Sequence, residues 1–263
     1  MSEVEMTEED LKALIKKANN LLLFTKDESQ IFILGTIHHY HLVETNDYSY
    51  AHIQSAIQSI APDVLLIEAR PETIEKYNAV DGPLEMVFAR CYACNHGISV
   101  KGIDWWYAAK NNKALEALEA RREDKLLDNI LSESAGYIKA LVLFGASHRE
   151  RIPELILKEG YEKVEIDCID KYFDNISIPF VYPKGMAEEY SRQVKYYESN
   201  FMDEINNNMA PDDELYDHWK SCTEPNEPSR QRILEMIAEN RLFKSIVAVY
   251  GKSCEQEIET TKN

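Results

Sequence analysis

The fold is decided by a stretch that reads Ile31-Phe32-Ile33-Leu34-Gly35-Thr36-Ile37-His38. Its first four side chains are apolar, which is typical of a short strand buried on both faces of a parallel sheet. The glycine after them lets the backbone turn tightly and come close to a bound group. The same form returns at Leu141–Phe144, which is followed by Gly145-Ala146-Ser147-His148. The two copies predict two buried strands, each followed by a histidine.

Outward from these two stretches, strand-like apolar runs alternate with helical patterns. Further strands are expected at 64–67, 99–102 and 164–166, and helices at 49–60, 83–96, 108–135 and 150–159. This alternation predicts an α/β fold with a mainly parallel central sheet flanked by helices. Near the N-terminus a helix is expected over 7–22, and the runs at 21–24 and 31–34 predict a hairpin.

The character of the chain changes after about Pro183. Residues 186–207 and 227–250 have helical patterns, and the connections between them are polar. The sequence therefore predicts an α/β catalytic core over 1–183 and a C-terminal helical extension over 184–263. This extension is expected to be a cap on the sheet or a partner surface, and it offers a route to a homodimer.

Composition and charge limit the classes of partner. The 263-residue chain has 46 acidic and 29 basic side chains and a net charge of −17, so it should repel nucleic acids and anionic lipids. The segment 1–10 is acidic, unlike a secretory signal, and no apolar run approaches the roughly 20 residues that span a bilayer. Five scattered cysteines do not suggest a disulfide scaffold. A cytoplasmic location is expected.

Chemistry-bearing residues follow four of the predicted strands: His38, Glu68, Asp104 and His148. Ligands of parallel α/β sheets bind beyond the carboxyl ends of the strands, so these side chains should meet at one edge. Two imidazoles and a carboxylate suit a divalent ion such as Zn²⁺, Mn²⁺, Co²⁺ or Fe²⁺, with His38, Glu68 and His148 as ligands. The same residues could instead act without metal, as a histidine base oriented by a carboxylate. The sequence leaves both mechanisms open.

A purely structural interpretation exists for each of these residues. A single histidine at a strand end is more often a structural hydrogen-bonding group than a ligand. Glu68 could be a buried carboxylate that pairs with Arg70. However, burying several ionisable groups together is costly unless they pair or hold a metal, and folding alone does not require them at four strand ends. Their conjunction favours a functional site.

The order of these motifs, from Leu-Gly-Thr-Ile-His to Gly-Ala-Ser-His, resembles the TraB/PrgY/GumN/Tiki family over roughly residues 21–167. Its wider relatives include the erythromycin esterases and the haem-binding ChaN proteins. The resemblance implies a hydrolase with His38, Glu68 and His148 at its catalytic centre. The helix around Arg122 is similar to an arginine-containing helix of those relatives, which implies that Arg122 stabilises an oxyanion. Secretion or membrane tethering, found in many members, is not indicated for this chain.

The sequence is thus interpreted as a metal-dependent hydrolase of an ester or peptide bond, acting on a small-molecule or peptide substrate. Glu68 is expected to be a metal ligand or the base, and Asp104 to orient a histidine. Five further residues are expected to contact the substrate: His39, His41, Arg70, Trp105 and Arg149. The alternative is a non-catalytic module that binds a peptide, haem or a similar ligand. Cys91 and Cys94, a lone Cys-x-x-Cys before His96, are expected to be buried structural thiols.

Overall fold

The computed structural model describes residues 21–37, 50–106, 112–173 and 182–201. Its centre is a six-stranded sheet with the strand order β4-β3-β5-β2-β1-β6. The four strands β4, β3, β5 and β2 run parallel, and β1 pairs antiparallel with both β2 and β6. The strands are β1 (Leu22–Lys26), β2 (Ser29–Thr36), β3 (Val64–Ile67), β4 (Ser99–Gly102), β5 (Lys139–Gly145) and β6 (Glu162–Val164). The predicted α/β fold is confirmed.

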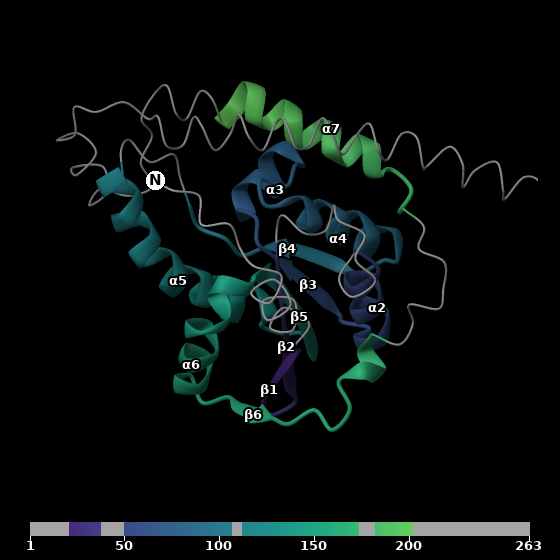
Figure 1. Ribbon diagram of the computed structural model, residues 1–263, viewed down its shortest axis with the longest axis vertical. Helices are drawn as coiled ribbons and strands as arrows, with labels where there is room; N and C mark the ends of the chain where they lie inside the picture. The colour runs from purple at the N-terminus through teal and green to yellow at the C-terminus, as the bar shows by residue number, and fades with distance from the viewer. Residues whose placement is uncertain (1–20, 38–49, 107–111, 174–181, 202–263) are drawn as a thin grey trace, which may run out of the picture.

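Helices cover both faces of this sheet (Figure 1). The helices α2, α3, α4 and α7 lie on one side, and α5 and α6 lie on the other. They are α2 (Tyr50–Ile60), α3 (Pro71–Tyr77), α4 (Leu84–Asn95), α5 (Asn112–Ser134), α6 (Arg151–Lys158) and α7 (Met186–Tyr196). Short turns of tighter or wider helix occur at η1 (Ala146–Arg149), η2 (Asp170–Tyr172) and η4 (Tyr197–Phe201).

The alternation of side chains along the strands builds a separate core on each face of the sheet. In β2, Phe32 and Leu34 pack with α2 and α4, whereas Ile31 and Ile33 pack with α5 and α6. Successive side chains of a strand point to opposite faces, so a strand covered on both faces has to be apolar throughout. This explains why the runs that predicted β2, β3 and β5 contain no polar side chain in their centres.

Two details differ from the sequence predictions. The last strand is β6 at Glu162–Val164 rather than 164–166, and all three of its residues are exposed rather than buried, because it lies at the edge of the sheet. The helix α3 was not predicted. It begins at Pro71, whose fixed φ suits the first turn of a helix, and it ends at Asn78, which has the left-handed conformation.

The start of the predicted C-terminal extension belongs to the main core. Met186 and Tyr190 of α7 are buried in the same cluster as β2 and α4, so the packed unit continues past residue 183 to Phe201. The predicted helices at 7–22 and 227–250, and the end of the one at 186–207, lie largely or wholly outside the described residues. Among the helices that are described, none is long and apolar enough to cross a membrane.

Candidate active site

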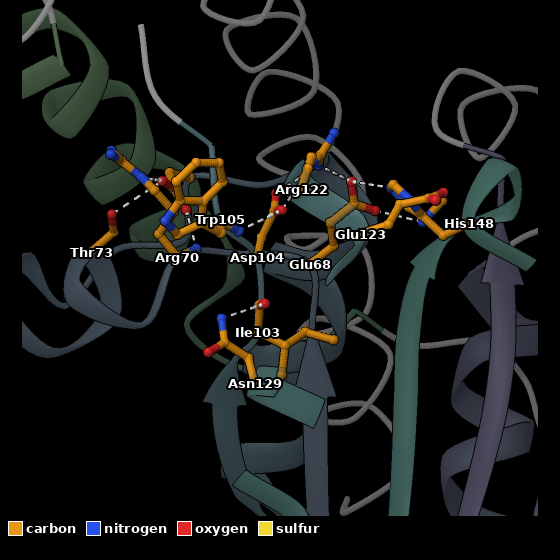
Figure 2. A network of polar contacts seen from close by, with 12 residues as sticks. Glu68, Arg70, Thr73, Ile103, Asp104, Trp105, Arg122, Glu123, Asn129 and His148 are labelled. Carbon is orange, nitrogen blue, oxygen red and sulfur yellow. Dashed lines mark hydrogen bonds and ion pairs between the residues drawn. The ribbon is translucent and has the colours of Figure 1, made fainter. Parts of the chain in front are cut away.

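Three of the predicted site residues meet at the carboxyl ends of the parallel strands. Glu68 directly follows β3, Asp104 lies two residues beyond β4, and His148 is in η1 after β5. Because β4, β3 and β5 are neighbours in the sheet, their ends lie side by side. A fourth residue, Arg122, approaches from α5 and lies between the two carboxylates (Figure 2). All four are buried, with exposed fractions of 1% to 6%.

Arg122 joins the two carboxylates through charged hydrogen bonds. Its Nε and Nη2 donate to the two oxygens of Asp104 over 2.8 and 2.7 Å, and Nη2 also donates to Oε1 of Glu68 over 2.6 Å. The paired donors of a guanidinium match the two oxygens of a carboxylate in this way. The backbone N–H of Trp105 donates to Asp104 as well. Arg122 therefore compensates much of the buried negative charge.

Glu68 is also fixed by the second Gly-x-x-His motif. The backbone N–H of Gly145 donates to its Oε2 over 2.5 Å. The strands β3 and β5 run parallel, with Ile67 paired to Leu143, so the residues after each strand meet at the same level of the sheet. Glu68 thus has a partner on each carboxylate oxygen, and its side chain is held in one orientation.

His148 lies between two carboxylates. Its Nε2 is 3.7 Å from Oε1 of Glu68, and its Nδ1 is 3.5 Å from Oε1 of Glu123 on α5. Both separations are ion-pair distances, too long or too poorly aligned for hydrogen bonds. Burial alone would lower the pKa of His148, but the neighbouring Glu68 carboxylate, with a smaller contribution from Asp104, outweighs burial and raises the pKa above the ordinary value of 6.5. Protonation of His148 is therefore favoured by its surroundings.

Two glycines allow the backbone to close around this cluster. A side-chain carbon on Gly82 would lie 1.8 Å from the carbonyl oxygen of Glu68, so only glycine fits there. A side-chain carbon on Gly35 would lie 2.2 Å from Cδ of Arg149. The glycine of the first Gly-x-x-His motif therefore makes room for the arginine that follows the second.

The structure brings Glu68, Asp104, Arg122 and His148 together as the sequence predicted. Asp104 was expected to orient a histidine; its hydrogen-bond partners among the described residues are Arg122 and the Trp105 N–H. An arginine has more donors than an imidazole, and Arg122 lies between the Glu68 and Asp104 carboxylates. The remaining predicted histidines, His38, His39 and His41, lie outside the described residues.

Arg70 has a structural position that differs from the expected contact with substrate or Glu68. It is 1% exposed, and its Nε pairs with the buried Asp81 over 2.5 Å. Its guanidinium also donates to the hydroxyl of Tyr196 and lies over the rings of Trp106 and Phe201. Arg70 immediately precedes α3, where the chain leaves the direction of β3, so its side chain points away from Glu68.

Trp105 and the cysteines have simpler surroundings. Trp105 is half-buried, and the guanidinium of Arg121 lies over its ring at 5.7 Å, so the described contact of this tryptophan is with the protein itself. Cys91 is buried, and burial raises the pKa of its thiol to about 12, which disfavours the reactive thiolate form. Cys94, expected to be buried, is exposed. His96 stacks on Tyr92 and its Nδ1 contacts the Tyr92 carbonyl.

The described part of the expected metal centre does not fit a metal ion. Oε1 of Glu68 lies 2.6 Å from the Arg122 guanidinium, whose positive charge repels a divalent cation, and Oε2 accepts the Gly145 N–H. Within the described ranges, no group of three or more His, Cys, Asp or Glu side chains is arranged to hold a metal. Arg122 supplies the positive charge between the carboxylates.

One member of the cluster was missed by the sequence prediction. Glu123 is adjacent to Arg122 on α5, and it pairs with both His148 and Arg151. The sequence placed Arg121, Arg122 and Glu123 on one helix but did not show which of them face the sheet. The sequence feature that could have pointed to Glu123 was its position next to Arg122, a predicted site residue.

Comparison of the chain with family models, with curated proteins and with solved structures finds no match. The resemblance to the TraB/PrgY/GumN/Tiki family therefore stays a prediction that rests on the motifs.

Proposed function

We propose that this protein hydrolyses an ester or amide bond, with His148 as the general base and Arg122 as the group that stabilises the oxyanion. The observation that carries the proposal is the contact of an imidazole, two carboxylates and a guanidinium at the carboxyl ends of neighbouring parallel strands. This is the edge at which α/β sheets bind their ligands. Small molecules and peptides both offer such bonds.

In this mechanism the neutral imidazole of His148 takes a proton from a water molecule as that water attacks the carbonyl carbon. Glu68 and Glu123 flank the ring, and their negative charges stabilise the imidazolium that forms. The pKa of His148 is raised above 6.5, and a base whose pKa is close to the working pH transfers protons most effectively.

Attack by water turns the carbonyl oxygen into an oxyanion. Arg122 is held in place by Asp104 and Glu68 before the reaction, so its positive charge needs no rearrangement as negative charge develops. The imidazolium of His148 then returns its proton to the leaving oxygen or nitrogen, and the carboxylic acid product remains. No step requires a metal ion.

One observation favours a second candidate, a non-catalytic ligand-binding or structural role. The cluster is deeply buried, and Arg122 pairs with both Glu68 and Asp104, as expected of an ion network that only supports the fold. The two candidates differ in what they predict for His148. A base is essential to turnover, whereas a structural histidine affects stability alone.

The test is a hydrolysis screen of the full chain with 4-nitrophenyl esters and a peptide library, followed by two variants. His148→Gln keeps a polar side chain of similar size and should lower kcat/KM by about 10²–10⁴-fold, the range for loss of a general base. His96→Gln, at the residue that follows α4, is the matched control and should leave kcat/KM unchanged. Equal rates for His148→Gln and the parent, in folded protein, would refute the hydrolase proposal and leave the second candidate.

A further inference from the structure

Arg149 differs from the other described arginines in having no carboxylate or ring partner among the residues that the structure describes. Five of the others pair with a carboxylate, and Arg121 lies over the Trp105 ring. The five paired ones are Arg70, Arg90, Arg122, Arg151 and Arg192. The Nε of Arg149 is buried and has no hydrogen-bond acceptor among the described residues.

This isolation is unexpected in so acidic a chain. There are 46 acidic and 29 basic side chains, so a carboxylate partner is easily supplied for almost any arginine. Arg149 is also partly buried, and burial lowers its pKa, with no neighbouring acid contributing to the shift. A guanidinium remains charged under all ordinary conditions, so Arg149 is a desolvated cation whose counter-charge is not provided by the described fold.

The position of Arg149 relates it to the candidate active site. It follows His148 in η1, after β5, and its side-chain carbons lie against Gly35 near the carboxyl end of β2. Because β2 and β5 are adjacent and parallel, Arg149 lies where these two strands end, beside the base. The carboxylates at the ends of the other parallel strands, Glu68 and Asp104, are already paired with Arg122.

We infer that Arg149 binds an oxyanion of the substrate, a carboxylate or a phosphate group. The fork of donors on a guanidinium suits both groups, and a bound oxyanion would give the buried Nε its acceptor. A second part of the inference rests on the proposed function. In this part, the ester or amide that His148 hydrolyses carries a negative charge near the bond that is broken. The positive charge of Arg149 attracts such a substrate even though the chain as a whole has a net negative charge.

The anion site can be tested without any turnover, by modification of the full chain with phenylglyoxal and peptide mapping. Inorganic phosphate and succinate, in separate arms, should slow the modification of Arg149 at least about fivefold. The arm that protects more strongly identifies which oxyanion is preferred. Arg151 and Arg192, which are already paired, are internal controls and should be modified at the same rate in all arms. Protection of Arg149 by neither anion would overturn the inference.

The substrate half is tested by kinetics on an anionic and a neutral ester, 4-nitrophenyl hemisuccinate and 4-nitrophenyl acetate. Arg149→Gln should raise KM for the anionic ester about tenfold or more, with kcat nearly unchanged, as expected for a charged hydrogen bond made equally in ground and transition states. The KM for the neutral ester should change less than about twofold. Arg192→Gln removes the same charge at a distant position and is the control.

The outcomes separate the two proposals. Protection of Arg149 together with an absence of hydrolysis would support the anion site and refute the hydrolase. Hydrolysis in which Arg149→Gln affects both esters equally would refute the anionic substrate and leave the hydrolase standing. Arg149→Lys keeps the positive charge but loses the paired donors of the guanidinium, so it should give an intermediate KM. This second variant keeps the test decisive if the glutamine variant fails to fold.

Discussion

The backbone N–H of Gly145 donates a hydrogen bond to Oε2 of Glu68 over 2.5 Å, joining positions 77 residues apart in the chain. Gly145, the glycine of the second Gly-x-x-His motif, thus holds the Glu68 carboxylate. This carboxylate lies beside His148, the histidine of the same motif. The other oxygen of Glu68 accepts from Arg122 and is the closer one to His148. The orientation of the glutamate is therefore decided by β5 and α5, and its charge acts on His148.

Glu68→Gln should lower the pKa of His148. The side chain keeps its shape but loses the negative charge that outweighs burial, so burial and Arg122 then dominate and both lower the pKa. NMR titration of the imidazole signal measures the change directly. Asp124→Asn, which removes an exposed charge on α5, is the matched control and should shift this pKa far less. An unchanged titration in the glutamine variant would contradict the assigned role of Glu68.

The same substitution should change how stability depends on pH. Because the folded pKa of His148 is raised, its contribution is fully present below the unfolded value of about 6.5 and is lost as pH rises through the folded value. The difference in free energy of unfolding between the parent and Glu68→Gln should therefore be larger at pH 5.5 than at pH 8.5. Urea denaturation at the two pH values measures this difference. A larger difference at pH 8.5 than at pH 5.5 would refute the predicted pH dependence.

Arg122→Met should destabilise the fold by about 3–5 kcal/mol, the usual cost of leaving buried charges without their partner. Both Glu68 and Asp104 lose their shared cation in this variant. The matched control is the neighbouring Arg121→Met, which removes a contact with the Trp105 ring and should cost about 1 kcal/mol or less. Urea denaturation of both variants measures the two losses of stability. Equal losses would contradict the bridging role of Arg122.

Arg70→Met should also destabilise by about 3–5 kcal/mol, because it leaves the buried carboxyl of Asp81 without its cation. Burial already raises the pKa of Asp81 despite the neighbouring Arg70. The double variant Arg70→Met, Asp81→Leu removes both charges and should recover part of the loss. A double-mutant cycle by urea denaturation measures the coupling. A coupling near zero would show that Arg70 is not a structural partner of Asp81.

Removal of divalent metal should leave the protein unchanged. The positive charge beside Glu68 belongs to Arg122, so dialysis against EDTA is expected to leave both the melting temperature and the hydrolysis rate as they were. Elemental analysis before and after dialysis provides a readout that is independent of activity. A stoichiometric metal whose removal lowers the melting temperature would establish the metal-dependent alternative.

The central strands could be predicted because burial on both faces requires an uninterrupted apolar run. Leu65, Leu66 and their neighbours in β3 show this pattern, and so do the centres of β2 and β5. By contrast, β6 is an exposed edge strand held by backbone pairing with β1, so its side chains are free of that requirement. The sequence of such a strand has no hydrophobic pattern from which the strand could be predicted.

The site could be predicted only in part for a related reason. Strand order brings Glu68, Asp104 and His148 to one edge, and the sequence motifs were enough to expect this. Which side chains pair depends on the exact direction of each chain segment after its strand. Arg70 is two residues from Glu68, but it turns with the start of α3 toward Asp81. The role of Glu123 depends on the rotation of α5 about its axis, which a pattern of charges does not determine.

The edge strand β6 has a consequence for self-association. A sheet edge with free backbone groups invites the addition of a strand from another molecule, which is a common start of aggregation. Here that edge is only three residues long, Glu162–Val164, and the charged side chains of Glu162 and Lys163 are exposed on it. Short length and charge both disfavour continuation of the sheet into a second copy across this border.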